Sequence, residues 1–447
     1  MIIDIESRPD SVALSRDENL KYRAWSVTAM VVMFATINWA DKAIIGIVAR
    51  ALQEDLGLTA SQIGYTGSAF FFLFSISGAA VGFLGDRFQV RWILLTLALI
   101  WGLIQFPILV SGTFGALLFS RILLGAAEGP ATAMANTAVF QWFPPAKRSF
   151  PSALVTSGSS LAKILVAPIL ALILAAWGWR ACFIVMGAVS FIWCLLWLFI
   201  AKEGPYARHD TNSSGAALSE TSIEAQSASR VPLSKIFLTP SFLGALFGTF
   251  TVYAVVAASI TWIPSYLEVG LGFSRLQSGL MFGLPSIASL IMMFGSTFIA
   301  DRLSSRNYTA RVTRALTTAG FLIVGGLTLC FLPSIETPYI VVGVLVFGYG
   351  CASVALPMMN AVISQITPVK QLASTLGVFL ALQNISGLIA PSLVGVLVDN
   401  SDAPLAGYSF AYQIFGVALL IGGLVVGVFV NPERDAARLQ NLIKDAG

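Results

Sequence analysis

The sequence predicts an all-α integral membrane protein with twelve transmembrane helices, arranged as two pseudo-symmetric halves of six. Three observations lead to this fold class. The 447 residues are 57% apolar and only 11% charged, whereas soluble proteins carry about 25% charged residues. Apolar stretches of about 20 residues, long enough to cross a bilayer, occur twelve times. A polar segment separates the first six stretches from the last six.

The expected spans follow these apolar stretches along the chain. In the first half they cover residues 26–49, 60–84, 92–111, 114–140, 150–174 and 180–200, and in the second half 241–267, 276–300, 313–333, 338–366, 371–397 and 407–430. The segment between the halves is rich in Ser, Ala and Thr, which is typical of a flexible, water-exposed linker. The expected domains are residues 1–201, a cytoplasmic linker at 202–237, and residues 238–447.

Lys and Arg are distributed unequally between the loops of the two sides. Twenty of the twenty-six lie on the side that holds both termini and the linker, whereas Arg50, Arg180 and Arg275 lie on the other. Positively charged loops stay in the cytoplasm, so both termini are expected there, in a multi-pass protein of the cytoplasmic (inner) membrane. A secretory signal is not expected, because the first 24 residues are polar.

The two halves also share a sequence motif. Asp86, Arg87 and Arg91 follow the second expected span, and Asp301, Arg302 and Arg306 follow the eighth with the same spacing. An Asp-Arg pair alone is a common occurrence. The same spacing at equivalent positions of two halves indicates a duplicated transporter.

Five charged residues lie inside the apolar spans, all of them in the first half: Asp41, Lys42, Arg121, Glu128 and Lys163. A charged side chain at the bilayer centre costs roughly 2.5–3.5 kcal/mol, so such residues face a protein interior or a water-filled cavity. Their formal charges sum to +1. A polar, slightly positive cavity inside the membrane suits an anion in transit.

The two embedded acids are expected to couple transport to protons. Arg121 and Glu128 share one helix face but lie about 10 Å apart along it, so each needs a partner elsewhere, with Asp41 and Lys163 as candidates. We expect Arg121 to control a neighbouring acid, either Asp41 or Glu128, and these two acids to carry the protons. The histidine of the chain, His209, lies in the polar linker. The alternative is a static charge network that locks helices one, four and five together.

The embedded lysines are the candidates for anion binding. Lys42 points about 100° away from Asp41 on a helix, and we expect it to hold the substrate anion; the alternative is an internal salt bridge. Lys163 either contacts substrate or neutralises an acid. The second half has no embedded charge and offers amides instead, at Asn360, Gln383 and Asn384, which serve either packing or binding because amides in lipid need partners.

These motifs resemble the major facilitator superfamily over all twelve spans. The Asp86-Arg87-x3-Arg91 loop is similar to the signature of that superfamily between helices two and three. Asn38-Trp39-Ala40-Asp41-Lys42, the Arg121-to-Glu128 segment and Ser157-Gly-Ser-Ser160 resemble parts of the anion:cation symporter family. Members of that family take up organic anions such as sugar acids, hydroxy acids and aromatic carboxylates, usually with protons.

The resemblance implies a major facilitator fold and proton-coupled uptake of a small carboxylate by alternating access. The substrate contacts that it implies, together with the basic groups above, are Asn38, Trp39, Lys42, Phe74, Ser159, Lys163, Asn360, Gln383 and Asn384. From their place at the cytoplasmic helix ends, we expect a conformational gate that locks the outward-open state, formed by Asp86, Arg87, Arg91, Asp301 and Arg302. Lys42 stands where Arg is usual, Trp39 and Phe74 replace Tyr, and Lys163 replaces a small residue. The expected site is therefore cationic and unusually aromatic.

Other functions fit the residues less well. A proton-antiport exporter of a metabolite or drug remains the alternative, although pumps for cationic drugs favour acidic cavities. An enzyme would need a nucleophile–base pair or a metal cluster, which the sequence does not supply. A sensor that does not transport is a third possibility. No cofactor, metal or nucleic acid is expected; the expected partners are the anion, protons and the lipid bilayer, and the protein is expected to be a monomer.

Overall fold

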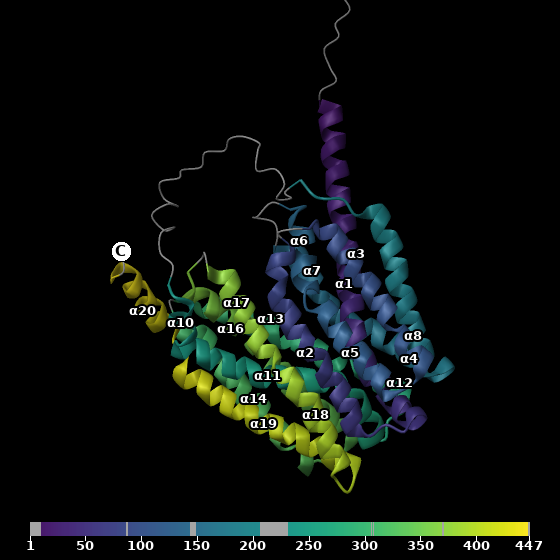
Figure 1. Cartoon of the computed structure of the whole chain (residues 1–447). Helices are drawn as coiled ribbons and strands as arrows, with labels where there is room; N and C mark the ends of the chain where they lie inside the picture. Colours follow the sequence, from purple (N-terminus) through teal and green to yellow (C-terminus); the bar gives the residue numbers. More distant parts are fainter. Residues whose placement is uncertain are drawn as a thin grey trace, which may run out of the picture.

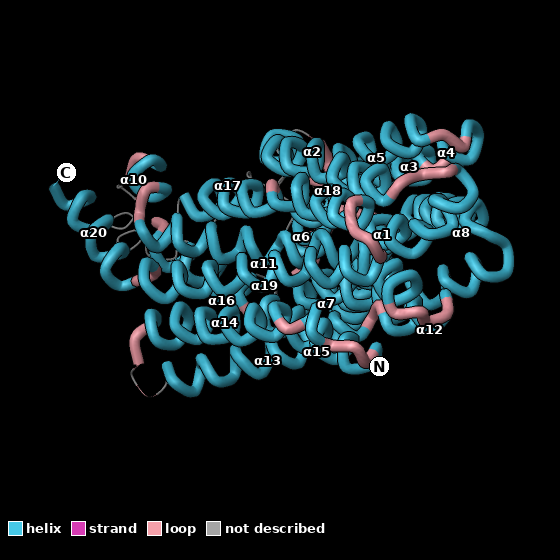
Figure 2. Tube along the Cα trace, turned by 90° about the horizontal axis from the view of Figure 1, so that it is seen from below, coloured by secondary structure: helices cyan, strands magenta, loops and turns pink. Residues whose placement is uncertain are grey.

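The computed structural model is all-helical in the residues that it describes, with short turns between the helices (Figures 1 and 2). The described residues are 10–85, 88–143, 149–205, 231–304, 306, 308–368 and 371–445. Much of the expected linker lies outside these ranges, so the domain limits at residues 201 and 238 stay a prediction.

The first half contains α1 (Asp10–Leu56), α2 (Ala60–Gly85), α3 (Val90–Ile104), α4 (Phe106–Ser111), α5 (Phe114–Glu128), α6 (Ala131–Phe140), α7 (Ser149–Leu161), the π-helical turn η2 (Ala162–Val166) and α8 (Ala167–Ile200). Helix α1 extends beyond the expected first span at both ends. Helix α8 holds parts of two spans, which join at Gly178 with φ 77°. Glycine adopts this left-handed conformation readily because it has no Cβ.

The second half contains α10 (Leu233–Phe237), α11 (Pro240–Ser265), η3 (Tyr266–Gly270), α12 (Arg275–Met281), α13 (Leu284–Ser304), η4 (Arg311–Leu316), α14 (Thr317–Cys330), η5 (Leu332–Ser334), α15 (Pro338–Ser353), α16 (Ala355–Ile366), α17 (Leu372–Asn384), α18 (Ser386–Asp399), α19 (Pro404–Phe429) and α20 (Pro432–Asp445). Side chains cap the entry of several helices. The Oγ1 of Thr239 accepts a hydrogen bond from the Phe242 amide at 3.2 Å at the start of α11. Such caps satisfy amides that lack a partner inside the helix.

The helices account for all twelve expected spans. Nine helical segments of the described chain are long and apolar enough to cross a bilayer, and one of these, Phe150–Ile200, contains the fifth and sixth spans. Helix α2 supplies the second span, and α5 followed by α6 supplies the fourth. The twelve helical spans predicted from the sequence are therefore confirmed.

Consecutive spans alternate in direction, which gives the bundle two distinct faces. The start of α1 and helix α20 lie toward the upper part of Figure 1, on what we call the terminal face. The end of α1 at Leu56 and the end of α18 at Asp399 lie toward the lower part, on the distal face. The candidate site lies between these two faces.

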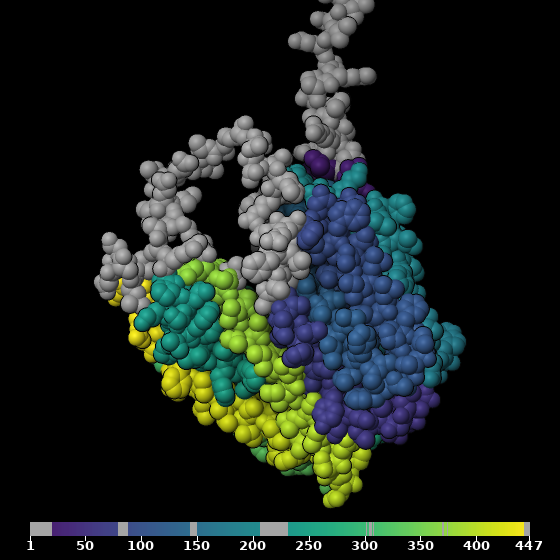
Figure 3. All heavy atoms as spheres, in the orientation of Figure 1, coloured from purple at the N-terminus to yellow at the C-terminus, as the bar shows by residue number. Residues whose placement is uncertain are grey.

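The two halves are closed against each other at the distal face. Helix α2 packs along α18, α1 along α11, and α8 along α12, and Figure 3 shows the purple and yellow-green helices meeting in the lower part of the molecule. Glycines allow the close approach. A Cβ on Gly64 would lie 2.6 Å from the Pro391 carbonyl oxygen, and one on Gly46 would collide with the Ile260 carbonyl. The backbones of the two halves therefore touch directly.

Charged side chains also join the halves at the distal face. Arg275 of α12 donates from Nη2 to Glu54 of α1 at 2.7 Å. Arg50 lies 2.7 Å from the same glutamate, and Glu268 lies 2.9 Å from Arg275. Most of these side chains are more than a third exposed, and exposed ion pairs stabilise by only about 0–1 kcal/mol each. The network favours the closed distal face without holding it permanently.

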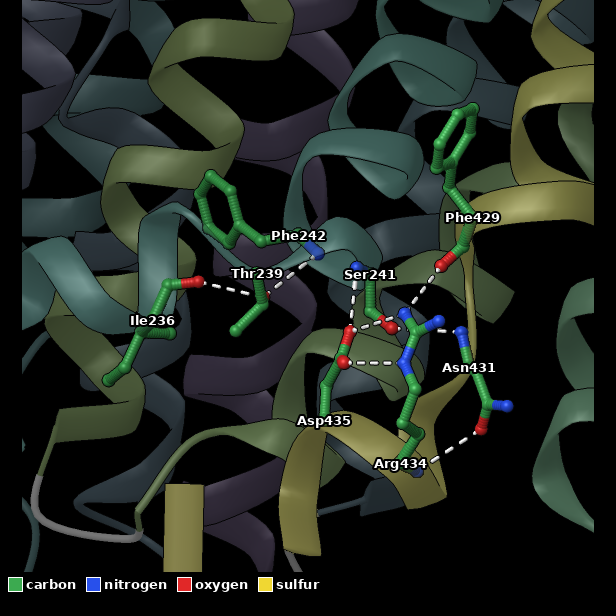
Figure 4. A network of polar contacts seen from close by, with 8 residues as sticks. All are labelled: Ile236, Thr239, Ser241, Phe242, Phe429, Asn431, Arg434 and Asp435. Carbon is green, nitrogen blue, oxygen red and sulfur yellow. Dashed lines mark hydrogen bonds and ion pairs between the residues drawn. The ribbon is translucent and has the colours of Figure 1, made fainter. Parts of the chain in front are cut away.

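At the terminal face a buried carboxylate docks helix α20 onto α11 (Figure 4). Asp435 accepts a hydrogen bond from the Ser241 amide at 2.9 Å and from Arg434 Nε at 2.9 Å. The amide of Asn431 in turn donates to Ser241 Oγ at 2.9 Å. Burial raises the pKa of Asp435, but the hydrogen bonds from Arg434 and Ser241 outweigh it, so this pKa lies below the ordinary value. The carboxylate is thus held in its charged form.

Candidate functional site

The five embedded charges of the first half converge on the middle of the bundle. Asp41, Arg121 and Glu128 are each at most 3% exposed, and Lys163 is 8% exposed. These residues lie in α1, α5 and η2, which belong to the first, fourth and fifth spans. The structure therefore brings together the charges that the sequence places on separate helices.

An ion pair between Lys42 and Glu128 forms the centre of the site. The ammonium of Lys42 lies 2.7 Å from Glu128 Oε2, and both side chains are almost wholly buried. The same ammonium donates a hydrogen bond to Asn38 Oδ1 at 2.6 Å, one helical turn away. Among the described residues, Oε1 of Glu128 has no hydrogen-bond partner. Lys42 is thus engaged in the internal salt bridge that was the alternative to substrate binding.

The second acid, Asp41, is held separately from the first. Its Oδ1 accepts a hydrogen bond from Gln105 Nε2 at 2.8 Å. Arg121 Nη1 donates to the backbone carbonyl of Asp41, at 3.0 Å, rather than to its carboxylate. Sequence reasoning missed Gln105, although a primary amide inside an apolar span is itself a sign of a buried partner.

Aromatic rings surround the ammonium of Lys42. It lies 4.7 Å from the ring centre of Trp39, 5.2 Å from that of Phe74 and 5.8 Å from that of Phe70. Cations within about 6 Å of a ring centre are attracted by its electron-rich face. Trp39 and Phe74, which stand where the resembled family has Tyr, therefore both face the site. The site lacks the two hydroxyls that Tyr would supply at these positions.

Glycine lets the helix that carries these rings approach the helix that carries the acid. A Cβ on Gly129, next to Glu128, would lie 2.6 Å from the amide of Gly78 in α2 and would collide with the Phe74 carbonyl. A larger residue at position 129 would separate α2 from α5. The ring of Phe74 would then move away from Lys42.

Lys163 lies at the boundary between the two halves. Its ammonium donates to the hydroxyl of Tyr349 in α15 at 3.4 Å and lies 5.5 Å from the ring centre of Trp39. Among the described residues, no acidic side chain forms an ion pair with Lys163. The residue sits in the π-helical turn η2, a local distortion that occurs frequently at functional sites. Two cations, Lys42 and Lys163, thus lie within 6 Å of the ring centre of Trp39.

The remaining expected contacts fall into two groups. Ser159 lines a cavity with Asn38 and Trp39, and its hydroxyl donates to the Thr156 carbonyl of its own helix at 3.2 Å. In the second half, Asn360 Oδ1 and Gln383 Oε1 are buried acceptors that lack hydrogen-bond partners within the described chain. Asn384 lies one residue further, at the end of α17. Unpaired buried amides are unusual, which keeps Asn360 and Gln383 as candidate ligand contacts.

The expected gate residues are only partly described. Asp86 and Arg87 lie outside the described residues. Arg91 places its guanidinium 4.7 Å from the ring centre of Trp92. Asp301 and Arg302 lie in the last turn of helix α13, at its carboxyl-terminal end. The role of these residues as a gate stays a prediction.

Comparison with known families agrees with this architecture. The Major Facilitator Superfamily model matches residues 30–355 and 310–445. The chain belongs to the major facilitator superfamily. Its members are transporters, so the expectation that the protein is not an enzyme is confirmed.

Relatives with named substrates match this member of the superfamily over nearly its whole length. It is 26% identical to the hexuronate transporter of Bacillus subtilis, over 91% of this chain and 94% of the relative. It is 27% identical to a probable sulfoacetate transporter of Cupriavidus necator, over 93% and 95%. It is 25% identical to a D-galactonate transporter of Escherichia coli, over 91% and 96%. These relatives agree with the anion:cation symporter resemblance.

Solved structures support the fold of this superfamily member. The structure of a D-xylose–proton symporter superimposes with a TM-score of 0.74 at 16% identity, over 92% of this chain and 99% of that one. An inward-facing bacterial homologue of the human lysosomal transporter Spinster gives a TM-score of 0.70 at 16% identity, over 93% and 98%. Both likenesses concern the fold alone.

Proposed function

We propose that the protein takes up a small organic carboxylate together with protons, across the cytoplasmic membrane, by alternating access. The observation that carries this proposal is the buried ion pair between Lys42 and Glu128, 2.7 Å apart. A substrate carboxylate and the carboxylate of Glu128 compete for the same ammonium. Because the two cannot both occupy it, protonation and substrate binding are linked.

The coupling cycle follows from this competition. When Glu128 is ionised, it holds Lys42 and disfavours the substrate. When Glu128 takes up a proton, it loses its attraction for the ammonium, and Lys42 becomes available to the substrate carboxylate. Release of the proton restores the internal pair and expels the anion. Proton and anion thus stabilise the same state of the carrier, which is the requirement for symport.

Asp41, Arg121 and Lys163 have supporting roles in this proposal. Arg121 holds the α1 backbone at Asp41 and so fixes the helix turn that carries Lys42. Asp41 is the second titrating acid. Lys163, without a described acidic partner, is the second anchor for the anion and lies beside Tyr349 of the opposite half. A ligand held by both lysines therefore contacts the interface that moves during transport.

The terminal face corresponds to the cytoplasm in this proposal, as the distribution of Lys and Arg indicates. The closed distal face then faces the outside. In the proposed cycle, the distal network between Glu54 and Arg275 opens when the site is exposed to the outside.

The test compares two transport modes in the same proteoliposomes. Glu128→Gln imitates the protonated acid, so we expect loss of accumulation driven by a proton gradient and retention of counterflow, in which labelled substrate exchanges for unlabelled. Glu336→Gln, at an exposed loop position, is the matched control and keeps both modes. Glu128→Gln that still accumulates substrate would move the coupling role to Asp41. If Glu128→Gln loses both counterflow and thermal stability, the result would support the static charge network.

A further inference from the structure

A small cavity adjoins the central lysine on the same face of α1. It has a volume of about 100 Å³ and lies between α1, α6 and α7. Its apolar walls are formed by Phe34, Ala35, Trp39, Ala131, Ala135 and Val155. Ala35 precedes Lys42 by seven residues, which is close to two helical turns and about 10 Å. The cavity and the ammonium of Lys42 therefore follow one another along the same side of the helix.

Three polar groups of this cavity already make hydrogen bonds within the protein. The hydroxyl of Thr156 donates to the Ser152 carbonyl at 3.0 Å, and the hydroxyl of Ser159 donates to the Thr156 carbonyl at 3.2 Å. The Oδ1 of Asn38 already accepts from Lys42, whereas its Nδ2 is buried without a hydrogen-bond partner in the described chain and is free to donate to one ligand oxygen. A ligand with several hydroxyl groups would lose its hydrogen bonds to water on entering the cavity and would find few free partners there. Buried hydroxyls without partners are unfavourable.

The shape and chemistry of the site instead match a flat apolar body with one charged end. Apolar cavities of about 150 Å³ hold benzene without water, so the space here is near the size of a single ring. Trp39 lies on the wall of the cavity and also next to both lysines. An aromatic ring in the cavity would contact this indole, while a carboxylate on the ring would point toward the ammonium groups.

We propose that the carried anion is an aromatic monocarboxylate with a single ring, rather than a polyhydroxylated sugar acid. The ring occupies the cavity beside Ala135 and Val155, and the carboxylate replaces Glu128 on Lys42, with Lys163 as the second cation. This inference rests on the proposed function, since the carboxylate binds only as Glu128 becomes protonated. The proposed substrate differs from those named for the hexuronate and D-galactonate relatives.

The test measures binding of benzoate, cyclohexanecarboxylate, D-glucuronate and D-galactonate to the purified full-length protein, by thermal shift and calorimetry. We expect benzoate to bind at least tenfold more tightly than either sugar acid. Ala135→Leu fills the cavity and should weaken benzoate binding at least tenfold while leaving acetate binding unchanged. Ala133→Leu, two residues away on the same helix with an exposed side chain, is the matched control and should bind benzoate normally.

Each outcome separates the ring inference from the broader proposal. Sugar acids that bind as tightly as benzoate would overturn the aromatic assignment and leave carboxylate transport intact. Binding of none of the four acids would contradict both. If Ala135→Leu does not fold, Ala35→Val narrows the same cavity from α1 and must weaken benzoate but not acetate. Unchanged benzoate affinity in a folded Ala135→Leu or Ala35→Val variant would place the ring elsewhere and reject the cavity.

Discussion

Asp399, at the end of α18 in the second half, caps the start of α2 in the first half. Its Oδ1 accepts a hydrogen bond from the Ala60 amide at 2.9 Å, and its Oδ2 accepts from the Ser61 amide at 2.7 Å. A carboxylate at a helix amino terminus satisfies free amides and interacts favourably with the helix dipole. Here the cap joins the two halves, which separate at the distal face in the proposed cycle.

Asp399→Ala should therefore shift the carrier away from the distal-closed state. Loss of a helix cap costs about 0.5–2 kcal/mol, equivalent to roughly 2- to 30-fold in the equilibrium. The measurement is the thiol-labelling rate of Thr261→Cys, a buried position at the contact between α1 and α11, which should rise by that factor. Asp402→Ala, in an exposed turn nearby, should label as the parent does. An unchanged rate in Asp399→Ala would mean that the cap does not hold the face closed.

Gly64→Ala should block closure of the distal face by a steric route. The added Cβ would lie 2.6 Å from the Pro391 carbonyl oxygen, and overpacking of this kind costs about 1–3 kcal/mol. We expect uptake to fall at least tenfold while substrate binding to the purified protein is retained. Gly377→Ala is the control, because a Cβ there meets no atom within 4 Å. Full uptake by Gly64→Ala would show that α2 and α18 can close with a wider spacing.

Lys42→Gln should abolish substrate binding. The change removes the ammonium that pairs with Glu128 and that we propose holds the substrate. Glu128 then becomes a buried carboxylate without its cation, an arrangement that costs about 3–5 kcal/mol if the charge remains. Lys42→Arg keeps the positive charge and should retain binding within about tenfold, which calorimetry on both variants can measure. Wild-type affinity in Lys42→Gln would leave Lys42 with a purely structural role.

Asp435→Ala should release α20 from the terminal face. The pKa of Asp435 is lowered in the folded protein, so its contribution to docking is complete above the ordinary Asp value of about 3.9 and is lost as the pH falls through the lowered value. Docking should thus be insensitive to pH between about 5 and 8. Hydrogen exchange of the α20 amides should accelerate in Asp435→Ala but not in Asp402→Ala. Protection that decreases between pH 7 and pH 5 would point to another titrating group.

The sequence was sufficient to predict the twelve spans and the five embedded charges, because apolar length and buried charge are properties of single segments. It was not sufficient to predict which acid meets which base. Glu128 pairs with Lys42 rather than with Arg121, and this depends on how α1, α2 and α5 pack around Gly129. The partner of Asp41 is Gln105, which lies at the junction of α3 and α4. Such contacts between helices depend on crossing geometry that local periodicity does not contain.

The proposed exchange of one carboxylate for another on Lys42 has an electrical consequence. A site that gains a monoanion and one proton carries the same net charge loaded and empty, so a cycle through Glu128 alone moves no charge across the membrane. Voltage, which contributes about 2.3 kcal/mol per charge per 100 mV, then does no work on the substrate. Accumulation would follow the pH difference alone, about tenfold for each pH unit. A second proton on Asp41 would make the cycle electrogenic, and the membrane potential would add to the driving force.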